Sequence, residues 1–506
     1  MPIDETVITA TTDASLGKDF APAPKPQFLR GLINLEPYHP DSNDELYSKD
    51  DKGIARLFAD IFKSKHRYNS TRGNWMFYDG KRWVDDERGL KAFESLKKLQ
   101  ASLVYYAQSS NREYYDFVVK YGSTNKRKNV LYDAQSVYPV TNEELDSNPY
   151  LFNCQDCTYD LRTFRPRKHS PDDLLTKVSN VQYNHPSKSS EAWKTFIDQI
   201  MQGDKEKAKY LQRAIGYTLT TSTEEECFFI LFGSTTRNGK STFIETILHL
   251  FGDYGTSTEP ATFQTMKMKD GGRATPQIAN LAGCRFLKTS EPPQNMTFDC
   301  ALLKTLTGSD TVPARRLYEA QFEFKPQFKL FMNTNHLPRV TDTTLFEGDR
   351  VRVITFDKHF TEEEQDRKLR SKLCKPESIS GIFEWALQGY EEYLRYGLQE
   401  PQSVKDAVKQ YEQDSDTIGQ YISEVLIPLE DKWTDGGLAY EAYRKWIATL
   451  GQQPLGRNGF FRILRERNLL HDRAYVQVTA SRKEQKRNVI LDYMLDEDWN
   501  PYKKNA

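Results

Sequence analysis

The chain has 506 residues, which is too long for a single hydrophobic core and predicts about three domains. Charged residues make up 28% and hydrophobic residues 38%, a soluble globular composition, and no stretch approaches the ~18 apolar residues of a membrane span. We therefore expect a cytoplasmic protein with no membrane partner. The formal net charge of −1 neither supports nor excludes binding to nucleic acid, which would depend on local basic patches.

The first third of the chain predicts a tail and a small α+β domain. Residues 1–48 are rich in Thr, Asp, Pro and Ser without sustained periodicity, so a mostly disordered tail is expected. A short helix follows at 54–62, and Asp79-Gly80 between two apolar runs predicts a β-hairpin. Residues 90–107 predict an amphipathic helix. Its apolar face would hold Leu90, Phe93, Leu96 and Leu99. The α+β domain would span residues 49–185.

The six cysteines do not predict a metal site. Only Cys154 and Cys157 have the spacing of a metal-binding pair, and a zinc site needs a second pair that the sequence does not show. Reduced thiols with a structural role in a reducing compartment are expected instead.

Residues 227–252 have the pattern of a strand, a glycine-bearing loop and a helix. The six apolar residues Cys227–Phe232 suit a strand that is buried on both faces of a parallel sheet. The polar run G-S-T-T-R-N-G-K-S-T follows, and apolar residues then recur at helical spacing up to Gly252. Because the loop would lie at a helix N-terminus, its unpaired backbone N–H groups and the helix dipole favour phosphate binding.

This loop predicts a site for a nucleoside triphosphate. Lys240 can reach the β and γ phosphates, and the Ser241 hydroxyl can bind Mg²⁺. Five residues separate Gly233 from Gly239, one more than in the usual phosphate loop, so we expect a remodelled lip. The strand before and the helix after the loop argue against a chance match. The expected ATP-binding residues are Gly233, Asn238, Gly239, Lys240, Ser241 and Thr242.

Three more strands are predicted after the loop helix, at 284–289, 328–334 and 350–356. Ligands bind at the carboxyl ends of strands in open α/β sheets, so the polar residues there should converge on the nucleotide. A nucleoside triphosphatase needs a carboxylate, a polar side chain near the γ phosphate and a cation for the developing charge, and Glu291, Asn335 and Arg350 fit these roles. Taken singly, Glu291 and Arg350 could form ordinary surface salt bridges. Arg352 is a rival cation, because strand alternation puts it on the same side as Arg350.

Five segments carry a resemblance to a known family. They are R-N-G-K-S-T (237–242), A-G-C-R-F-L-K-T-S-E (282–291), L-T-G-S-D (306–310), K-L-F-M-N-T-N-H-L-P (329–338) and D-R-V-R-V-I-T-F (349–356). Together they resemble the superfamily 3 helicases, most closely the phage and plasmid primase-helicase family that includes the poxvirus primase-helicases. The resemblance extends from about residue 70 to residue 495 and includes W-M-F-Y-D-G-K-R-W and Y-D-L-R-T before the loop.

The resemblance implies a AAA+ type motor with a parallel sheet over residues 186–370. In the family such motors form a homo-oligomeric ring, usually a hexamer, and unwind DNA with 3′ to 5′ polarity. The resemblance would place Lys240 and Ser241 at the phosphates and Mg²⁺, and Asn335 as a sensor. Glu291 would be the catalytic acid and a metal ligand, and Arg350 a finger acting on the ATP of the neighbouring subunit. Because Ser290 stands where many relatives have a second acid, metal binding would rely on Ser241 and water.

Residues 311–326 could form a hairpin that projects from the sheet, and in the family this hairpin points into the ring channel. Arg315, Arg316 and Lys325 would then contact DNA phosphates. A hairpin that packs on its own subunit is the alternative. The expected tip is Glu319-Ala320, where relatives often carry basic residues.

The C-terminal region, residues 371–506, ends in the order helix, helix, strand, basic turn, strand, which predicts a winged helix. Its second helix carries Arg457, Arg462, Arg465 and Arg467, and its turn contains S-R-K-E-Q-K-R. A charge run is more often a solvated face than a DNA site, so DNA contact and subunit docking both remain open.

The sequence thus predicts an ATP-dependent, ring-forming replicative DNA helicase of a phage, plasmid or similar mobile element. ATP and Mg²⁺ would be its cofactors, and single-stranded and forked DNA its substrates. The alternative is a nucleotide-gated DNA-binding initiator or primase-recruiting platform with weak ATPase activity, and stimulation of ATPase by single-stranded DNA separates the two. A small-molecule kinase would not explain Arg350 or the basic winged helix. No primase site is visible before the motor, so a separate primase or initiator protein is an expected partner.

Overall fold

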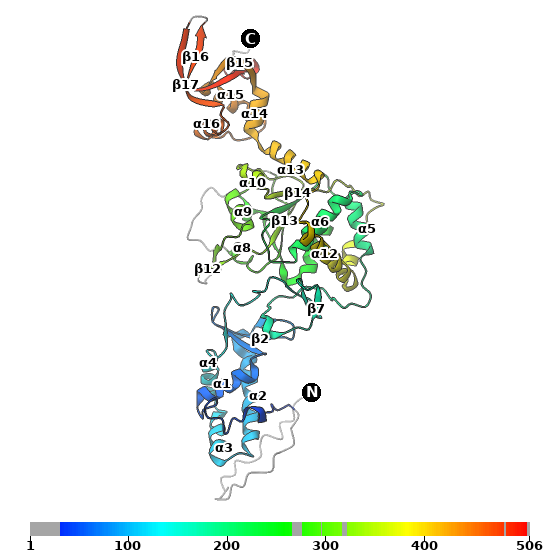
Figure 1. Ribbon diagram of the computed structural model, residues 1–506, viewed down its shortest axis with the longest axis vertical. Coiled ribbons are helices and arrows are strands. Elements are labelled where there is room, and N and C mark those ends of the chain that lie inside the picture. Colours follow the sequence, from blue (N-terminus) through cyan, green and yellow to red (C-terminus); the bar gives the residue numbers. More distant parts are fainter. Residues whose placement is uncertain (1–30, 266–275, 295, 316–320, 480–481, 503–506) are drawn as a thin grey trace.

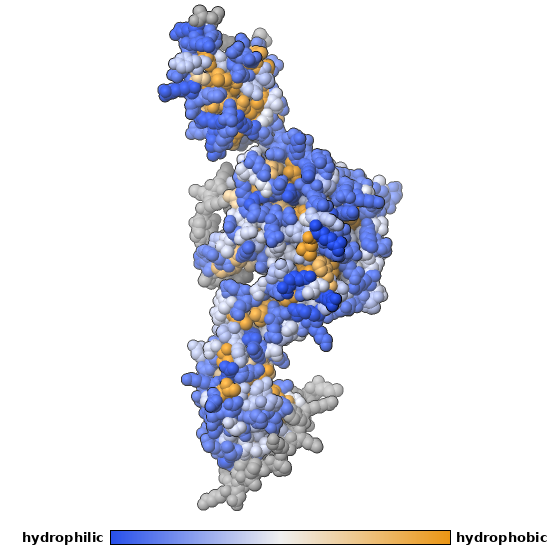
Figure 2. Space-filling view, viewed as in Figure 1, coloured by the Kyte–Doolittle hydropathy of each residue, from blue (hydrophilic) through white to orange (hydrophobic). Residues whose placement is uncertain are grey.

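The computed structural model describes residues 31–265, 276–294, 296–315, 321–479 and 482–502. Figure 1 shows an elongated molecule, with the N-terminal helices at one end, a layered α/β part in the middle and the C-terminal sheet at the other end. Figure 2 shows that the visible surface is mainly hydrophilic, with small hydrophobic areas on each part. Within the residues described, no helix combines the length and the apolar character that crossing a membrane requires.

The N-terminal part packs four helices beside a small sheet. The helices are α1 (Asp51–Phe62), α2 (Leu90–Ala107), α3 (Arg112–Val119) and α4 (Thr124–Ala134). The sheet has the order β3-β2-β1-β4, with β1 (His66–Asn69), β2 (Asn74–Tyr78), β3 (Trp83–Asp85) and β4 (Pro139–Val140). The predicted hairpin is confirmed as the antiparallel pair β2–β3, in which Phe77 lies opposite Val84. The predicted helix over 90–107 is confirmed as α2.

Two predictions for this part are wrong in detail. Leu90, the first residue of α2, is 61% exposed and so does not belong to the buried face of the helix. Disorder was expected for residues 1–48, yet Leu35 and Tyr47 are buried in the same core as α1. These apolar side chains are too widely spaced along the chain to produce a periodic pattern. Residues 1–30 lie outside the described residues.

The central part is built on a five-stranded parallel sheet with the order β14-β8-β13-β10-β9. Its strands are β8 (Phe228–Phe232), β9 (Gly255–Thr258), β10 (Phe286–Thr289), β13 (Lys329–Thr334) and β14 (Val351–Thr355). Four of these strands were predicted, whereas β9 is a short, polar edge strand without an apolar pattern. Alternate residues of β8 belong to two different cores, with Phe229 and Leu231 in one and Phe228 and Ile230 in the other. The strand is therefore buried on both faces, as predicted.

Helices cover both faces of this sheet. The first core contains residues of α5 (Glu191–Ile200), α6 (Lys205–Thr218), α7 (Lys240–Phe251) and α12 (Pro376–Tyr396). The second core contains residues of α8 (Pro276–Ala279), α9 (Cys300–Thr307), α10 (Thr344–Glu347) and α13 (Gln402–Ser415), together with the hairpin of β11 (Val312–Arg315) and β12 (Gln321–Phe324). Of these helices, α5 and α6 directly precede β8 along the chain.

The first core extends beyond the boundaries that were predicted at residues 185 and 370. A small antiparallel sheet of β5 (Leu151–Asn153), β6 (Thr158–Asp160) and β7 (Arg165–Arg167) packs on it. Phe152 stacks on Phe383 of α12, with ring centroids 5.2 Å apart, so segments on either side of both boundaries share one core. The buried Arg285 guanidinium ties this sheet to the end of α6 by donating to the carbonyls of Leu151 and Leu219. Such contacts join distant segments and leave no local sequence pattern.

The C-terminal part follows α13 with a compact helical and antiparallel domain. Its elements are α14 (Thr417–Val425), β15 (Leu426–Asp435), α15 (Gly436–Thr449), α16 (Arg457–Glu466), β16 (Leu470–Thr479) and β17 (Arg482–Leu495). The sheet order is β15-β17-β16, and Trp446, Phe460 and Ile490 lie in its core. The two predicted helices and two predicted strands are confirmed, and β15 is an addition.

Candidate functional site

The loop between β8 and α7 leaves no room for side chains at its two glycines. At Gly239 the backbone has a φ of 87°, in the left-handed region, and a Cβ atom there would collide with Ile200 of α5. A Cβ atom at Gly233 would collide with the Asn238 amide and approach the Lys240 ammonium. The backbone N–H of Gly233 donates to the Thr334 carbonyl at the end of β13. The loop is thus held tightly at the carboxyl edge of the sheet.

Lys240 is the first residue of α7, and its side chain folds back under the loop. The residue is only 4% exposed, and its ammonium group donates to the Gly233 carbonyl at 3.0 Å and to Asn335 Oδ1 at 2.6 Å. Burial lowers the pKa of Lys240 to about 8, and the nearby Glu291 carboxylate opposes that shift. Below that pH Lys240 is therefore a buried cation beneath the loop, and no carboxylate of the described residues bonds to it directly. A phosphate anion placed there would favour the charged form.

The predicted acid and sensor converge on this lysine from two neighbouring strands. Asn335 follows β13 and Glu291 follows β10, and these strands are adjacent and parallel. The backbone N–H of Asn335 donates to Glu291 Oε1 at 3.2 Å, so a direct chain of contacts links Lys240, Asn335 and Glu291. The convergence expected for the carboxyl ends of parallel strands is therefore observed.

The oxygen atoms near the loop suit Mg²⁺. Ser241 and Thr242 lie in the first turn of α7, and the Ser241 hydroxyl is 3.5 Å from the Asn333 amide, which comes from the same strand end as Asn335. The Ser241 hydroxyl and the Glu291 carboxylate are the donor types that Mg²⁺ prefers, and this ion commonly takes only one or two protein ligands beside phosphates and water. The two residues predicted as metal ligands therefore fit the ion chemically.

Arg350 lies at the amino ends of the strands, whereas the loop lies at their carboxyl ends. Val351 pairs with Phe228, the first residue of β8, whereas the loop follows Phe232, so the two sites are separated by about 15 Å of strand. Arg350 Nη2 donates to Glu226 Oε2 at 2.6 Å, and Nη1 donates to Thr307 Oγ1 at 3.1 Å. The structure therefore does not bring Arg350 to the loop of its own chain.

The rival cation, Arg352, is also engaged within the chain. Its guanidinium donates to Glu400 Oε2 at 3.2 Å, and both side chains are largely buried. Like Arg350, it does not lie with Lys240 in this structure.

The predicted hairpin is confirmed as the antiparallel pair β11–β12, with Arg315 opposite Gln321. Arg315 and Lys325 are exposed, whereas Val312 and Ala314 on the other face of β11 are buried in the second core. The base of the hairpin thus packs on its own subunit and its basic side chains face outward. Arg316 and the expected tip lie outside the described residues.

A buried lysine near the site was missed by the sequence analysis. Lys207 of α6 is 6% exposed, and its ammonium group donates to Thr355 Oγ1 at 3.2 Å and Asp357 Oδ2 at 3.4 Å, where β14 ends. It lies in the charged run K-E-K-A-K, which has the appearance of a solvated helix face. Only the position of α6 against the sheet edge distinguishes it from its neighbours.

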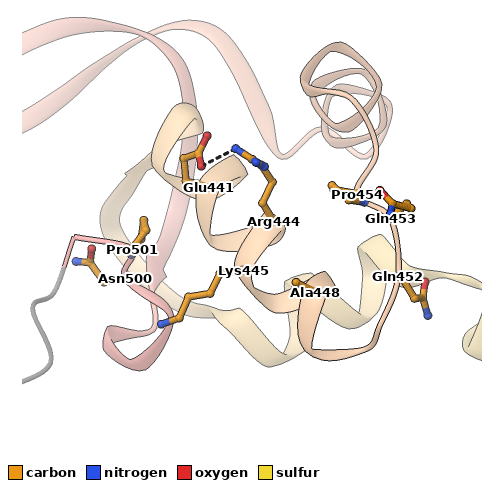
Figure 3. Close-up of a pocket in the computed structure, with 9 residues that line it drawn as sticks. All are labelled: Glu441, Arg444, Lys445, Ala448, Gln452, Gln453, Pro454, Asn500 and Pro501. Atoms are coloured by element: carbon orange, nitrogen blue, oxygen red, sulfur yellow. Dashed lines mark hydrogen bonds and ion pairs between the residues drawn. The ribbon is translucent and has the colours of Figure 1, made fainter.

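A polar surface cavity of about 680 Å³ lies far from this loop, in the C-terminal part (Figure 3). Arg444 and Lys445 of α15 line it together with Gln452 and Asn500, and Arg444 forms an ion pair with Glu441 at 3.2 Å. Its cations are thus already partnered, because Lys445 also donates to the Asp498 carbonyl. The candidate site is therefore defined by the loop and the strand ends and not by this cavity.

The fold and the site define a class of protein: an α/β protein whose parallel sheet carries a glycine loop at a helix start, with an acid and an amide at neighbouring strand ends. Residues 55–202 match the family described as D5 N terminal like. Residues 231–350 match a family of unknown function, DUF5906, and this range runs from β8 to Arg350. It therefore contains the loop and both partner strand ends.

Several curated relatives are viral proteins whose names give helicase as a provisional assignment. L207/L206 of Acanthamoeba polyphaga mimivirus is 24% identical over 443 residues, covering 78% of this chain and 45% of that protein. 022R of Frog virus 3 is 29% identical over 240 residues, which is 43% of this chain and 24% of that protein. 121R of Invertebrate iridescent virus 3 is 22% identical over 457 residues, covering 76% and 48%. The chain thus spans less than half the length of these relatives.

A solved apo structure of the NrS-1 C-terminal region aligns with 88% of this chain and 100% of its own, at 12% identity and a TM-score of 0.45. The family and sequence matches support a D5-like primase-helicase family, and they confirm the predicted resemblance to the primase-helicase family of phages, plasmids and poxviruses.

Proposed function

We propose that this chain is an ATP-driven DNA helicase that acts in replication of a virus or related mobile element, in the cytoplasm of its host. The observation that carries the proposal is the chain of contacts from the buried Lys240 through Asn335 to Glu291 at the start of α7. A buried lysine, a carboxylate and an amide, brought together at the carboxyl ends of parallel strands, are side-chain groups that ATP hydrolysis requires. The central part would then be a AAA+ type motor of superfamily 3.

Each residue of the site has a defined task in this proposal. The backbone N–H groups of the loop and of the first turn of α7 bind the phosphates, and Lys240 exchanges its contacts with Gly233 and Asn335 for phosphate oxygens. Glu291 orients the attacking water, and Asn335 responds to the γ phosphate. Ser241 and Glu291 would hold Mg²⁺, which would supply positive charge next to the phosphates. Once Lys240 has released it, the Asn335 amide can contact the γ phosphate. Because Asn335 directly follows β13, the presence or loss of that phosphate is transmitted to this strand.

The cation that completes the site comes from a second subunit in this proposal. Arg350 is remote from the loop of its own chain, whereas Lys240, Glu291 and Asn335 of that chain lie together at the loop. A ring, expected to be a hexamer, would bring Arg350 to the neighbour's ATP. To reach that ATP, the Arg350 side chain must break its ion pair with Glu226. In this proposal the ion pair keeps Arg350 away from the nucleotide until the neighbouring subunit binds ATP.

The C-terminal part supports DNA contact by its order of elements. We propose that α14, β15, α15, α16, β16 and β17 form a winged helix, and their succession with a three-stranded antiparallel sheet supports this. Arg457 and Arg462 on α16 are exposed, although Arg465 is held by Asp472 at 2.7 Å. We propose that α16 contacts DNA phosphates next to the motor.

The proposal is tested by unwinding of forked DNA with ATP and Mg²⁺. The wild-type chain should separate the strands and hydrolyse ATP faster when single-stranded DNA is added. Glu291→Gln should bind ATP yet lose hydrolysis and unwinding, because the loop, Lys240 and Ser241 still hold the nucleotide while the charge that orients the attacking water is removed. Nucleotide-dependent DNA binding without unwinding, in the wild type, would favour an initiator or primase-recruiting platform. Normal turnover by Glu291→Gln would contradict its role.

Substitutions in the hairpin are expected to weaken DNA binding. Arg315→Ala and Lys325→Ala should each weaken binding of single-stranded DNA to the same extent for all sequences, because a translocating motor holds the backbone. The slope of log affinity against log salt should fall by up to about one unit for each phosphate that the variant no longer neutralises. Lys98→Ala on the exposed face of α2 serves as the matched control. An unchanged slope for both hairpin variants would mean that the hairpin does not hold DNA.

A further inference from the structure

The lip of the phosphate loop (residues 234–237) is held from outside by the segment that leaves β14, here named the loop clamp (residues 357–362). The backbone N–H of Phe360 donates to the Arg237 carbonyl at 2.9 Å, and His359 Nδ1 lies 2.8 Å from the Thr236 carbonyl oxygen. Because a carbonyl only accepts, Nδ1 carries the proton in this contact. Arg237 also forms an exposed ion pair with Glu362 at 3.6 Å. Two successive lip carbonyls thus have partners on the clamp.

The lip requires external support, because its own sequence does little to fix it. All four lip residues are exposed, and Arg237 has a φ of 58°, in the left-handed region that non-glycine residues avoid. Within the loop, the lip is held by the Asn238 side-chain amide, which donates a hydrogen bond to the Thr235 carbonyl at 2.5 Å. This stretch also holds the residue by which the loop exceeds the usual length. Without the clamp, a longer and strained lip would sample several conformations.

The clamp has a fixed base from which to hold the lip. The backbone N–H of Phe356, a fully buried residue, donates to the Phe232 carbonyl at 2.7 Å, directly before the loop. Lys207 then binds Asp357 and Thr355 where the clamp begins. The base is therefore anchored to β8 on one side and to α6 on the other.

We propose that His359 is a positioning residue of the nucleotide site, which holds the lip so that the backbone N–H groups of the loop point at the phosphates. This inference rests on the proposed function, in which the loop binds ATP. It assigns a role to a residue outside every motif of the sequence. It also gives the longer lip hydrogen-bond partners at Thr236 and Arg237, so the longer loop remains competent to bind nucleotide.

The test measures the affinity of the full chain for a fluorescent ATP analogue and the kinetics of ATP hydrolysis. His359→Ala should weaken the affinity about three- to tenfold, the effect of one hydrogen bond, and should raise KM while kcat at saturating ATP changes little. His359→Asn should restore most of the affinity, because its amide can donate from the position of Nδ1. His471→Ala, an exposed histidine of β16, is the matched control and should bind as the wild type does.

The outcomes separate this inference from the function on which it rests. Equal affinity of the wild type and a folded His359→Ala variant would overturn the role of His359 while leaving the ATP site intact. Equal losses in the Ala and Asn variants would overturn the hydrogen bond as its basis. A wild-type chain that binds no nucleotide would overturn the proposed function, and the clamp with it. Melting curves of each variant show that the measured change belongs to the loop and not to the fold.

Discussion

Lys240→Ala is expected to reduce ATP turnover by at least about 10²-fold, the cost of removing one preorganised donor from a developing charge. The Lys240 ammonium is buried under the loop and, among the residues that the structure describes, has the Gly233 carbonyl and the Asn335 amide oxygen as its hydrogen-bond partners. No second lysine or arginine of the described residues contacts these two oxygens, so nothing in that part of the chain can replace it. A steady-state ATPase assay with and without single-stranded DNA measures the loss.

The fold should survive this substitution, which makes the assay interpretable. Burial lowers the pKa of Lys240 to about 8, so the folded state disfavours its charged form, and removing the lysine takes away no stabilising charge. Lys209→Ala, on the exposed face of α6, is the matched control and should keep full turnover. Wild-type turnover by a folded Lys240→Ala protein would show that this loop does not bind the reacting phosphates.

The parallel sheet and the site could be predicted because the signals are local. Strands buried on both faces are short apolar runs; β8 has this form throughout, and β10, β13 and β14 are mainly apolar with one Lys or Arg each. Polar residues that follow such strands lie at the same end of the sheet, and this rule predicts that Glu291 and Asn335 converge; their direct contact follows from the pairing of β10 with β13. The glycine loop between a strand and a helix positions Lys240 in the same way.

The remainder depends on contacts between distant segments. Strand β9 is the polar run G-T-S-T, which pairs only because β10 offers it an edge. Lys207 and His359 belong to a charged helix and an irregular segment, and each gains its role through a partner more than 100 residues away. Leu35 and Tyr47 likewise are buried only because the N-terminal helices cover them. No pattern in a single segment encodes such pairs.

Arg350→Ala is expected to bind ATP but to hydrolyse it about 10³- to 10⁵-fold more slowly, as for removal of an arginine finger. Arg350 directly precedes β14, at the sheet edge remote from its own loop, and its guanidinium is paired with Glu226. Its removal therefore leaves Lys240, Asn335 and Glu291 in contact and should not weaken nucleotide binding. Fluorescent ATP-analogue binding and single-turnover hydrolysis, measured on the same variant, separate the two effects. Arg352→Ala provides the comparison, because that cation lies nearby and is paired with Glu400.

Mixing Arg350→Ala subunits with Lys240→Ala subunits decides whether the finger acts between chains. In a mixed ring, an Arg350→Ala subunit keeps an intact loop, and a Lys240→Ala neighbour can supply an intact Arg350. Hydrolysis should therefore reappear on mixing, although each variant alone is inactive, and should be greatest near equal proportions. Subunit exchange must be shown independently, for example by energy transfer between labelled chains. If mixed rings form and exchange yet never hydrolyse ATP, Arg350 does not act in trans, and either Arg352 or a cation within one subunit completes the site.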